Sequence, residues 1–341
     1  TSAALDITPF DRDIPPLALG GRDVAVSPVG TEVAIVYNPD SVLATSTNND
    51  IFVMGPDGST RQAITATKGN DHSPHYSPDA RYIAYLSMAT PGLESDRQQL
   101  MVYERATGRR LPITPRWNLS IIDFQWSTDA RSVFAEVEER GGHAIYRIEI
   151  PSGRTTRLVS GGTNSAPQTS ARGDVLVFLH STADHPPEIW AAAVDGRNPH
   201  PVTHVTDRAI ADLDLPAPES FGFLGARGDS VFGWIIKPPD FSPLRRYPVL
   251  YLIHGGPQSA WLDQWHSRWN YAMFAARGYV VVAVNFHGST GYGQEFTNSI
   301  SRNWGGLPFD DLMKGLDVVA NLAYTDSTRI GAAGASYGGY M

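Results

Sequence analysis

The 341-residue chain contains no cysteine. This absence excludes disulfides, cysteine-ligated metals and thiol chemistry, but it does not separate an oxidising compartment from a reducing one. Charged residues are scarce, at 18%, and the net charge is −8 without any run of Lys and Arg. Because nucleic acids are bound through clustered positive charge, we expect no nucleic-acid partner.

Long apolar stretches are also missing. No hydrophobic run approaches the roughly 18 residues of a membrane helix, so no membrane partner is expected. The first residues, Thr1 to Ala4, do not resemble a signal peptide, which leaves a leader absent, removed or outside this sequence. We expect a periplasmic or secreted location, with the cytoplasm as the alternative. The chain is instead rich in Gly (32) and Pro (25), which is typical of a globular protein with many short strands and turns.

The first two-thirds of the chain repeats one phrase: a polar turn, a β-rich strand, a second strand, a tight turn and a third strand. The polar turns begin at Ser27, Ser77, Ser127 and Ser170. A recurrence of about 43–50 residues is that of four-stranded propeller blades, whereas a β-sandwich, the alternative, would not repeat the same phrase. We therefore predict an incomplete β-propeller with WD40-like or TolB-like blades over residues 1–205, and residues 5–26 look like the tail of an earlier blade.

Four histidines fall within the repeats, and we interpret them as residues of blade turns on the surface: His72, His75, His180 and His185. After residue 205 the blade rhythm disappears, and Pro216 and Pro218 interrupt the chain. Residues 206–219 are therefore predicted to be an inter-domain linker.

The pattern then changes to alternating buried strands and helices. Residues 249–253, 279–284 and 329–333 are continuously apolar, as expected of strands covered on both faces. Helices are predicted near residues 264–277 and over 307–323. This alternation indicates a parallel α/β sheet, so residues 220–341 are predicted to be the first half of an α/β-hydrolase domain, ending just after its nucleophile turn.

The last residues carry the chemistry. Gly334-Ala335-Ser336-Tyr337-Gly338 follows an apolar strand and fits the G-x-S-x-G elbow, in which a sharp turn exposes the serine above the sheet edge. Glycine is needed on both sides because the turn brings the flanking backbone close together. Ser336 is the predicted nucleophile, although a Gly-rich turn with a hydrogen-bonded serine is the alternative.

An oxyanion site is predicted beside this elbow. The loop His254-Gly255-Gly256-Pro257 follows the buried strand expected to neighbour the elbow strand. A backbone N–H of this loop and that of Tyr337 can converge where the tetrahedral oxygen forms. A simple Gly-Gly-Pro turn is the alternative.

The general base is harder to find. α/β-hydrolases order their triad Ser, then Asp or Glu, then His, and no residue follows Met341 here. His254 and His287 lie on loops near the sheet edge but are not expected to be the base. Asp310 and Asp311 are interpreted as carboxylates capping a helix N-terminus rather than as a metal pair. No metal and no cofactor are expected.

Four phrases in this order over residues 247–341 resemble the prolyl oligopeptidase family of serine peptidases, and most of all its dipeptidyl-peptidase V and acylaminoacyl-peptidase branch. They are His254 to Gln258, Asn285 to Gly293, Asn303 to Leu312 and Gly334 to Met341. The resemblance implies that Ser336 is the nucleophile and that Tyr337 and Gly256 form the oxyanion hole through their N–H groups. One departure is His287, where the family's phrase has Arg, which puts an ion pair from this loop in doubt.

The resemblance also implies an activity: release of dipeptides or acyl-amino acids from the N-termini of short peptides, with a propeller that restricts access. It implies further blades before Thr1 and a further segment of about two hundred residues carrying the Asp and His, without which the chain is expected to be inactive. A homo-oligomer is possible. The alternatives are a carboxylesterase and a non-catalytic propeller that only binds.

Overall fold

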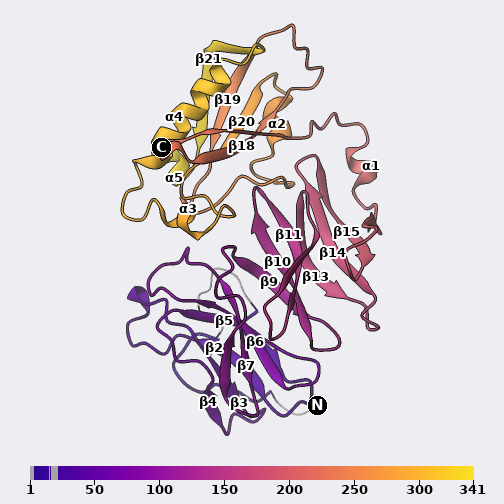
Figure 1. Ribbon diagram of the computed structural model, residues 1–341, viewed down its shortest axis with the longest axis vertical. Helices are drawn as coiled ribbons and strands as arrows, with labels where there is room; N and C mark the ends of the chain where they lie inside the picture. The colour runs from indigo at the N-terminus through magenta and orange to yellow at the C-terminus, as the bar shows by residue number, and fades with distance from the viewer. Residues whose placement is uncertain (1–3, 15, 17–21) are drawn as a thin grey trace. The chain divides into compact units, whose positions relative to one another are not determined.

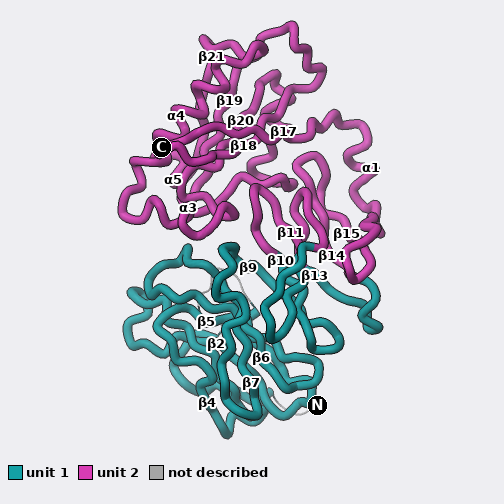
Figure 2. The backbone as a smooth tube through the Cα atoms, viewed as in Figure 1, with its two compact units in different colours: residues 1–136, 146–157, 167–175 teal, residues 137–145, 158–166, 176–341 magenta. Residues whose placement is uncertain are grey.

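The computed structural model describes residues 4–14, 16 and 22–341. Contacts within the chain divide it into two compact units, shown in Figure 2. Unit 1 comprises residues 1–136, 146–157 and 167–175, and unit 2 comprises residues 137–145, 158–166 and 176–341. Each unit is described by itself. The domain boundaries expected from the sequence, at residues 205 and 220, stay a prediction.

Unit 1 contains two four-stranded antiparallel sheets in which sequential strands are neighbours (Figure 1). The first sheet is formed by β1 (Val24–Val26), β2 (Val33–Tyr37), β3 (Asp50–Met54) and β4 (Arg61–Ala63). The second is formed by β5 (Asn70–Tyr76), β6 (Tyr82–Met88), β7 (Gln99–Glu104) and β8 (Arg109–Pro112). These strands lie where the repeated phrase predicts them.

Two of the polar turns of the repeat, those at Ser77 and Ser127, share one hydrogen-bond pattern. The Ser77 hydroxyl donates to Asp79 Oδ1 at 2.6 Å and accepts from the N–H of Tyr82, while Ala80 has a φ of 57°. Ser127 and Asp129 repeat this arrangement at 2.7 Å. The serine side chain therefore closes the turn by satisfying backbone and carboxylate groups at once, which explains the recurrence of Ser-x-Asp before these strands.

An eight-stranded sheet follows, with strands in both units. Its strands are β9 (Ile121–Trp126), β10 (Ser132–Glu139), β11 (Gly142–Glu149), β12 (Thr155–Val159), β13 (Thr163–Thr169), β14 (Val175–Thr182), β15 (His185–Ala193) and β16 (His200–Pro201). β12 pairs with β11, and the two repeats join through a single parallel bridge, His143 to Thr163, between β11 and β13.

The expected placement of four histidines in turns is wrong. His72 and His75 lie on β5, His180 on β14 and His185 on β15, and His72 is buried. The sequence of β5, Asn-Asp-His-Ser-Pro-His-Tyr, is polar enough to resemble a loop, but its backbone pairs with β6. The pairing partner, which the local sequence does not reveal, decides the conformation.

The C-terminal sheet has five strands in the order β17-β18-β20-β19-β21. They are β17 (Glu219–Leu224), β18 (Ser230–Ile236), β19 (Tyr247–Ile253), β20 (Val280–Asn285) and β21 (Thr325–Gly334). β17, β18 and β20 pair antiparallel, whereas β20, β19 and β21 run parallel. β20 is the middle strand of the five, and all six of its residues are buried.

Helices cover both faces of this sheet. On one face, Val280, Val282 and Val284 pack with α4 (Leu307–Ala320), and on the other, Val281 and Ala283 pack with α2 (Tyr271–Ala275). The short helices α1 (Asp207–Ile210), α3 (Gln294–Asn298) and α5 (Tyr337–Tyr340) complete the unit. The expected long helix over residues 264–277 is therefore only the five-residue α2. Among the described residues, no helix is long and apolar enough to cross a membrane.

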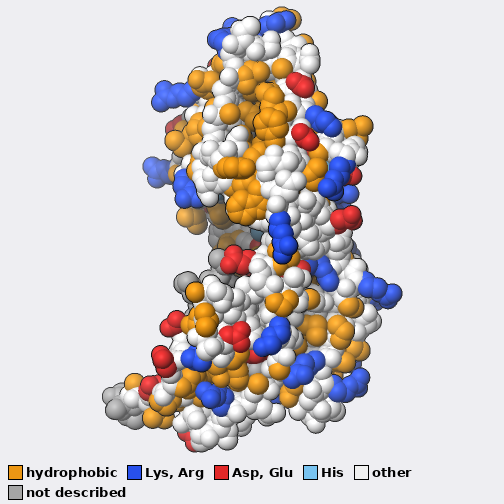
Figure 3. All heavy atoms as spheres, turned by 90° about the vertical axis from the view of Figure 1, so that its left-hand side faces the viewer, with side chains coloured by type: hydrophobic (Ala, Val, Ile, Leu, Met, Phe, Trp, Pro, Cys, Tyr) orange, Lys and Arg blue, Asp and Glu red, His pale blue; other side chains and the backbone are white. Residues whose placement is uncertain are grey.

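The elbow strand differs from its prediction. β21 was expected to be covered on both faces, but it is the edge strand of the sheet and most of its residues are exposed or half-buried. Figure 3 shows hydrophobic side chains gathered in the upper part of the molecule, the part that contains α4 and β21. The exposed large hydrophobic residues near these elements include Trp304, Phe309, Met313, Val318 and Tyr340.

Candidate active site

The strand–turn–helix at the end of the chain has the geometry of an elbow. β21 ends at Gly334, and α5 begins at Tyr337 with Ser336 as its N-cap. Ser336 has a φ of 57° and a ψ of −123°, a backbone conformation that costs a non-glycine residue about 1–3 kcal/mol. Such strain persists only where the surrounding structure imposes it, and it commonly marks a functional site.

Two glycines allow this turn. A Cβ on Gly338 would overlap the carbonyl oxygen of Ile253, and a Cβ on Gly334 would overlap that of Gly338. These clashes are with backbone atoms, which cannot move aside without displacing β19 or the turn. The predicted need for glycine at both positions is confirmed.

The loop from His254 to Pro257 lies against the elbow. A Cβ on Gly255 would lie 3.2 Å from the carbonyl oxygen of Ala335 and 3.5 Å from Cβ of Ser336. Gly256 has a φ of 125°, which L side chains rarely adopt. The two segments meet because β19 and β21 are parallel neighbours whose carboxyl ends reach the same sheet edge.

The two predicted oxyanion donors remain available. Among the hydrogen bonds between described residues, neither the N–H of Gly256 nor that of Tyr337 donates to a protein acceptor. The Tyr337 side chain is buried, and its hydroxyl donates to the carbonyl oxygen of Trp304 at 2.6 Å, which fixes the start of α5. The oxyanion role of the two N–H groups stays a prediction.

A cavity of about 360 Å³ opens beside Ser336. The His254–Gly256 loop forms one part of its wall, and residues Ser259–Leu262 together with Trp269 and Tyr271 form another. Arg268 and His266 add a polar side, and His266 Nδ1 accepts from the N–H groups of Arg268 and Trp269. The cavity is large enough for a side chain of a bound substrate.

His254 is not available as a base. The side chain is buried and stacks on Phe286 with ring centroids 4.1 Å apart. Its Nδ1 lies 2.8 Å from the carbonyl oxygen of Gly255, which only accepts, so Nδ1 carries the proton and Nε2 accepts from the Ser289 hydroxyl at 2.9 Å. Burial lowers the pKa of His254 to about 4, against the hydrogen bond to Gly255. This neutral ring positions two loops.

His287 pairs with two carboxylates, although the sequence put an ion pair from its loop in doubt. Its Nδ1 lies 2.6 Å from Asp311 Oδ2 and its Nε2 lies 3.1 Å from Asp229 Oδ2. Burial opposes the charge, but the hydrogen bond and charge of Asp311, reinforced by Asp229, raise the pKa of His287 above its usual value. The doubt that the sequence raised about an ion pair from this loop is therefore unfounded, because an imidazolium occupies the place of the family's Arg.

Asp311 is more than a helix cap. It is fully buried, and besides the ring of His287 it accepts from the N–H of His287 and the N–H of Ala226, each at 2.6 Å. The capping interpretation is wrong for Asp311, whereas Asp310 is exposed in the first turn of α4. Asp311 instead ties α4 to the loop after β20 and to the β17–β18 turn.

The segment that forms the cavity wall is also held by the last repeats of the β-rich region. Within unit 2, the N–H of Asp263 donates to Gly141 O at 2.7 Å and Asp263 Oδ1 accepts from the N–H of Ala183 at 2.8 Å. Glu138 accepts from the Thr290 hydroxyl at 2.6 Å, and burial raises the pKa of Glu138. No local sequence pattern points to Asp263 or Glu138. Their partners lie far away in the sequence: Ala183 is 80 positions from Asp263, and Thr290 is 152 positions from Glu138.

Comparison with known sequences adds to this geometry. A sequence model described as the prolyl oligopeptidase family matches residues 265–341, which include the elbow and the loop of His287. Residues 265–341 therefore match the prolyl oligopeptidase family. The resemblance stated from four short phrases is thereby confirmed.

Curated relatives extend the match over nearly the whole chain. The probable dipeptidyl-peptidase 5 of Emericella nidulans is 35% identical over 342 residues, covering 94% of this chain and 47% of that protein. The dipeptidyl-peptidase 5 of Porphyromonas gingivalis is 30% identical, covering 97% of this chain and 49% of that protein. The chain thus spans about half the length of the curated relatives that it matches.

Solved structures show the fold. An acylaminoacyl peptidase of Pyrococcus horikoshii superposes with a TM-score of 0.78 at 21% identity, over 93% of this chain and 48% of that one. Dipeptidyl peptidase 4 of Porphyromonas gingivalis superposes with a TM-score of 0.69 at 23% identity, over 97% of this chain and 46% of that one. The described residues therefore share the fold of these two peptidases over nearly the whole chain. They hold no cluster of His, Asp and Glu suited to a metal ion.

Proposed function

We propose that the protein carrying this chain is a serine peptidase that releases dipeptides or acyl-amino acids from the N-termini of short peptides. The observation that carries the proposal is the backbone of Ser336, held at a φ of 57° by glycines that admit no Cβ on either side. A serine that only closed a turn would not require this strain. The names of the relatives, dipeptidyl-peptidase 5 above all, support the substrate class.

In this mechanism Ser336 Oγ attacks the scissile carbonyl to form an acyl-enzyme, which water then hydrolyses. The N–H groups of Gly256 and Tyr337 stabilise the negative oxygen of each tetrahedral intermediate. Both are backbone donors on segments fixed by neighbouring strands, so they need little reorganisation during the reaction. The cavity beside Ser336 receives a side chain next to the scissile bond.

The base and its acid are proposed to come from polypeptide outside these 341 residues. Both ring nitrogens of His254 and of His287 are engaged with other groups, which removes the histidines of the loops after β19 and β20 from consideration. The relatives are about twice as long as the chain, which leaves room for such a segment. Without a base, the Ser336 hydroxyl would be a weak nucleophile at neutral pH.

Selection for short substrates is proposed to come from a β-propeller in residues 1–205, joined through residues 206–219 to the hydrolase domain in residues 220–341. The support is the two four-stranded antiparallel sheets in sequence order, together with the serine turn that recurs at Ser77 and Ser127, since each four-stranded sheet has the form of a propeller blade. A ring of blades in front of a catalytic serine would admit only short or unfolded peptides.

The test is labelling of the full-length protein with a fluorophosphonate, followed by turnover of dipeptidyl and acyl-aminoacyl p-nitroanilides. Ser336→Ala should abolish labelling and lower kcat at least about 10³-fold with little change in substrate binding. The matched control is Ser327→Ala, because Ser327 is an exposed serine on β21, the strand that leads into the elbow. Turnover of p-nitrophenyl esters alone would indicate a carboxylesterase, and peptide binding without labelling would indicate a non-catalytic binding protein.

A further inference from the structure

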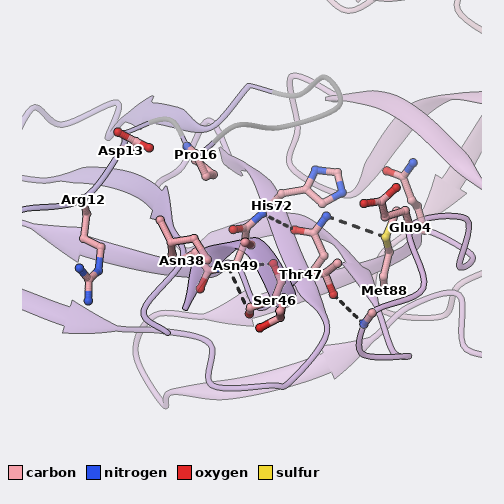
Figure 4. Close-up of a pocket in the computed structure, with 16 residues that line it drawn as sticks. Arg12, Asp13, Pro16, Asn38, Ser46, Thr47, Asn49, His72, Met88 and Glu94 are labelled. Carbon is pink, nitrogen blue, oxygen red and sulfur yellow. Dashed lines mark hydrogen bonds between the residues drawn. The ribbon is translucent and has the colours of Figure 1, made fainter. Parts of the chain in front are cut away.

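Two buried histidines of the chain carry a neutral ring, His72 in unit 1 and His254 in unit 2. Burial lowers the pKa of each ring to about 4. His72 lies in the wall of a cavity of about 630 Å³ (Figure 4), but its Nε2 is inaccessible and its ring interacts with the Gln98 side chain, so it offers no polar atom to a ligand. Both nitrogens of His254, in contrast, belong to a series of hydrogen bonds that reaches the loop beside Ser336.

This series begins at Ser289 and ends at the backbone of Gly255. The Ser289 hydroxyl donates to His254 Nε2 at 2.9 Å, and His254 Nδ1 donates to the carbonyl oxygen of Gly255 at 2.8 Å. The second bond decides the direction of the first, because a carbonyl oxygen only accepts and Nδ1 must therefore carry the proton. Ser289 thus stabilises the tautomer in which the ring can donate to Gly255.

Packing in the core leaves the ring of His254 one orientation. It stacks on Phe286 with the ring planes 15° apart and the centroids 4.1 Å apart, and Trp261 makes an edge contact with it at 6.2 Å. A 180° flip of the imidazole would put carbon atoms in the places of both nitrogens, which would leave the Gly255 oxygen and the Ser289 hydroxyl without these bonds. The direction of the Nδ1–H group is therefore set by the core and not by the loop.

The oxygen that His254 binds and the N–H of Gly256 belong to the same peptide group. The bond between Gly255 and Gly256 is trans, and in a planar trans peptide group the carbonyl oxygen and the N–H point in opposite directions. A glycine on each side lets this group turn more freely than any other in the loop. Among the hydrogen bonds of the described turns and loops, none joins a backbone N–H to this oxygen. The side chain of His254 therefore supplies the bond that fixes the peptide group.

We propose that His254 is a positioning residue of the oxyanion site and sets the direction of the Gly256 N–H through the carbonyl oxygen of Gly255. The proposal rests on the function proposed above, in which that N–H stabilises the tetrahedral oxygen. Both nitrogens of His254 are already bonded, so the ring takes no proton from Ser336. The bond to the carbonyl also polarises the peptide group, which makes its N–H a stronger donor. A donor that is oriented before the substrate binds needs no reorganisation in the transition state.

The experiment compares two amide variants of the full-length protein, His254→Asn and His254→Gln. The amide nitrogen of Asn lies as many bonds from Cβ as Nδ1 of histidine and can still donate to Gly255, whereas that of Gln lies as far away as Nε2 and cannot. Turnover of a dipeptidyl p-nitroanilide is measured per active site, and the sites are counted by fluorophosphonate titration. We expect His254→Gln to lower kcat about 10- to 100-fold with KM nearly unchanged, and His254→Asn to keep a kcat at least about ten times higher than that of His254→Gln.

A transition-state analogue separates positioning from a merely structural role. A peptide aldehyde adds to Ser336 and places a tetrahedral oxygen in the oxyanion site, whereas the dipeptide product binds without one. The Ki of the aldehyde should rise in His254→Gln by the factor by which kcat/KM falls, and the Ki of the dipeptide should stay the same. Loss of folded protein alone would reduce the number of titrated sites and would change neither Ki.

Ser289→Ala keeps the ring and its packing, and it carries the test if a His254 variant does not fold. It should lower kcat and raise the aldehyde Ki about threefold, because only the bond that stabilises the tautomer is lost. His200→Gln, at an exposed histidine of β16, is the control and should change neither value.

Two results overturn the proposal while leaving the proposed function intact. One is an equal kcat per titrated site in His254→Asn and His254→Gln, and the other is an aldehyde Ki that Ser289→Ala leaves unchanged. A wild-type protein that neither reacts with the fluorophosphonate nor turns over peptides contradicts the proposed function itself, and the positioning role is then wrong as well.

Discussion

The two units treat buried polar groups in opposite ways. In unit 2, the buried His254, Asn285, His287 and Asp311 each have hydrogen-bond partners, and Asn285 alone bonds to both backbone groups of Trp261 and to the Tyr292 hydroxyl. In unit 1, by contrast, lie all the buried side-chain atoms that lack a partner among the described residues: Asn48 Oδ1, Asp71 Oδ1, His72 Nε2, Gln98 Oε1 and Arg147 Nε.

Paired and unpaired buried polar side chains have different effects on the fold. A fully satisfied network rigidifies its surroundings, and in unit 2 it fixes the loops next to Ser336. A buried atom without a partner costs about 1–3 kcal/mol. The comparison therefore predicts that removing a hydrogen-bonded buried group of unit 2 should destabilise the protein strongly, whereas removing one of the unpaired atoms of unit 1 should destabilise it little or not at all.

The largest expected effect is that of Asp311→Ala. This substitution leaves the N–H groups of Ala226 and His287 and the His287 ring without their buried acceptor. We expect the full-length protein to lose about 3–5 kcal/mol of stability, as when one partner of a buried ion pair is removed. Chemical denaturation measures it, with Asp317→Ala, an exposed position on the same helix, as the control that changes stability by less than about 0.5 kcal/mol. Equal effects at both positions would contradict the role given to Asp311.

Much of the fold could be predicted from the sequence because its signals are local. The serine turns and the strands after them recur at a similar spacing, and the apolar run that forms β20 needs no partner to be identified as a buried strand. The strand conformation of β5 and the edge position of β21 were not predicted, because both depend on which strands pair with them and not on their own sequences. The compartment and the domain boundaries stay predictions.

At the site, the same distinction holds. Ser336 and the glycines around it form a short motif whose geometry follows from its own sequence. The clamp of His287 by Asp229 and Asp311 joins residues 58 and 24 positions away, so the sequence offered only the absence of an expected Arg. Buried pairs of this kind are set by tertiary structure, which no local pattern encodes.

A smaller effect is expected from pH, through His287. Its pKa is raised in the folded protein above the ordinary value of 6.5, by Asp311 chiefly and by the more exposed Asp229. The protonated ring therefore stabilises the fold fully below about pH 6.5, and this contribution is lost as pH rises through the raised pKa. Melting temperatures measured between pH 6 and 9 should fall for the wild type more steeply than for His287→Gln.

The control for this pH dependence is His200→Gln, because His200 is exposed on β16 and its ring hydrogen-bonds to the carbonyl oxygen of Asn198 rather than to a carboxylate. That variant should keep the slope of the wild type. His287→Arg provides a second comparison, since a guanidinium stays charged throughout this range and should flatten the slope. A wild-type melting temperature that rises between pH 6 and 9 relative to His287→Gln would reverse the sign and contradict the clamp.

The smallest effect, and the only one of opposite sign, is expected for Gln98→Met. Methionine keeps the length of the side chain but removes an amide whose buried oxygen has no hydrogen-bond partner of normal geometry among the described residues, so that acceptor no longer has to be desolvated. We expect the full-length protein to gain up to about 1 kcal/mol, measured by chemical denaturation. Asn285→Leu in unit 2 is the counterpart and should lose stability, because it breaks three hydrogen bonds around Trp261. If Gln98→Met also destabilises, the oxygen already has a partner in solution, and the two interiors are less different than their hydrogen bonds indicate.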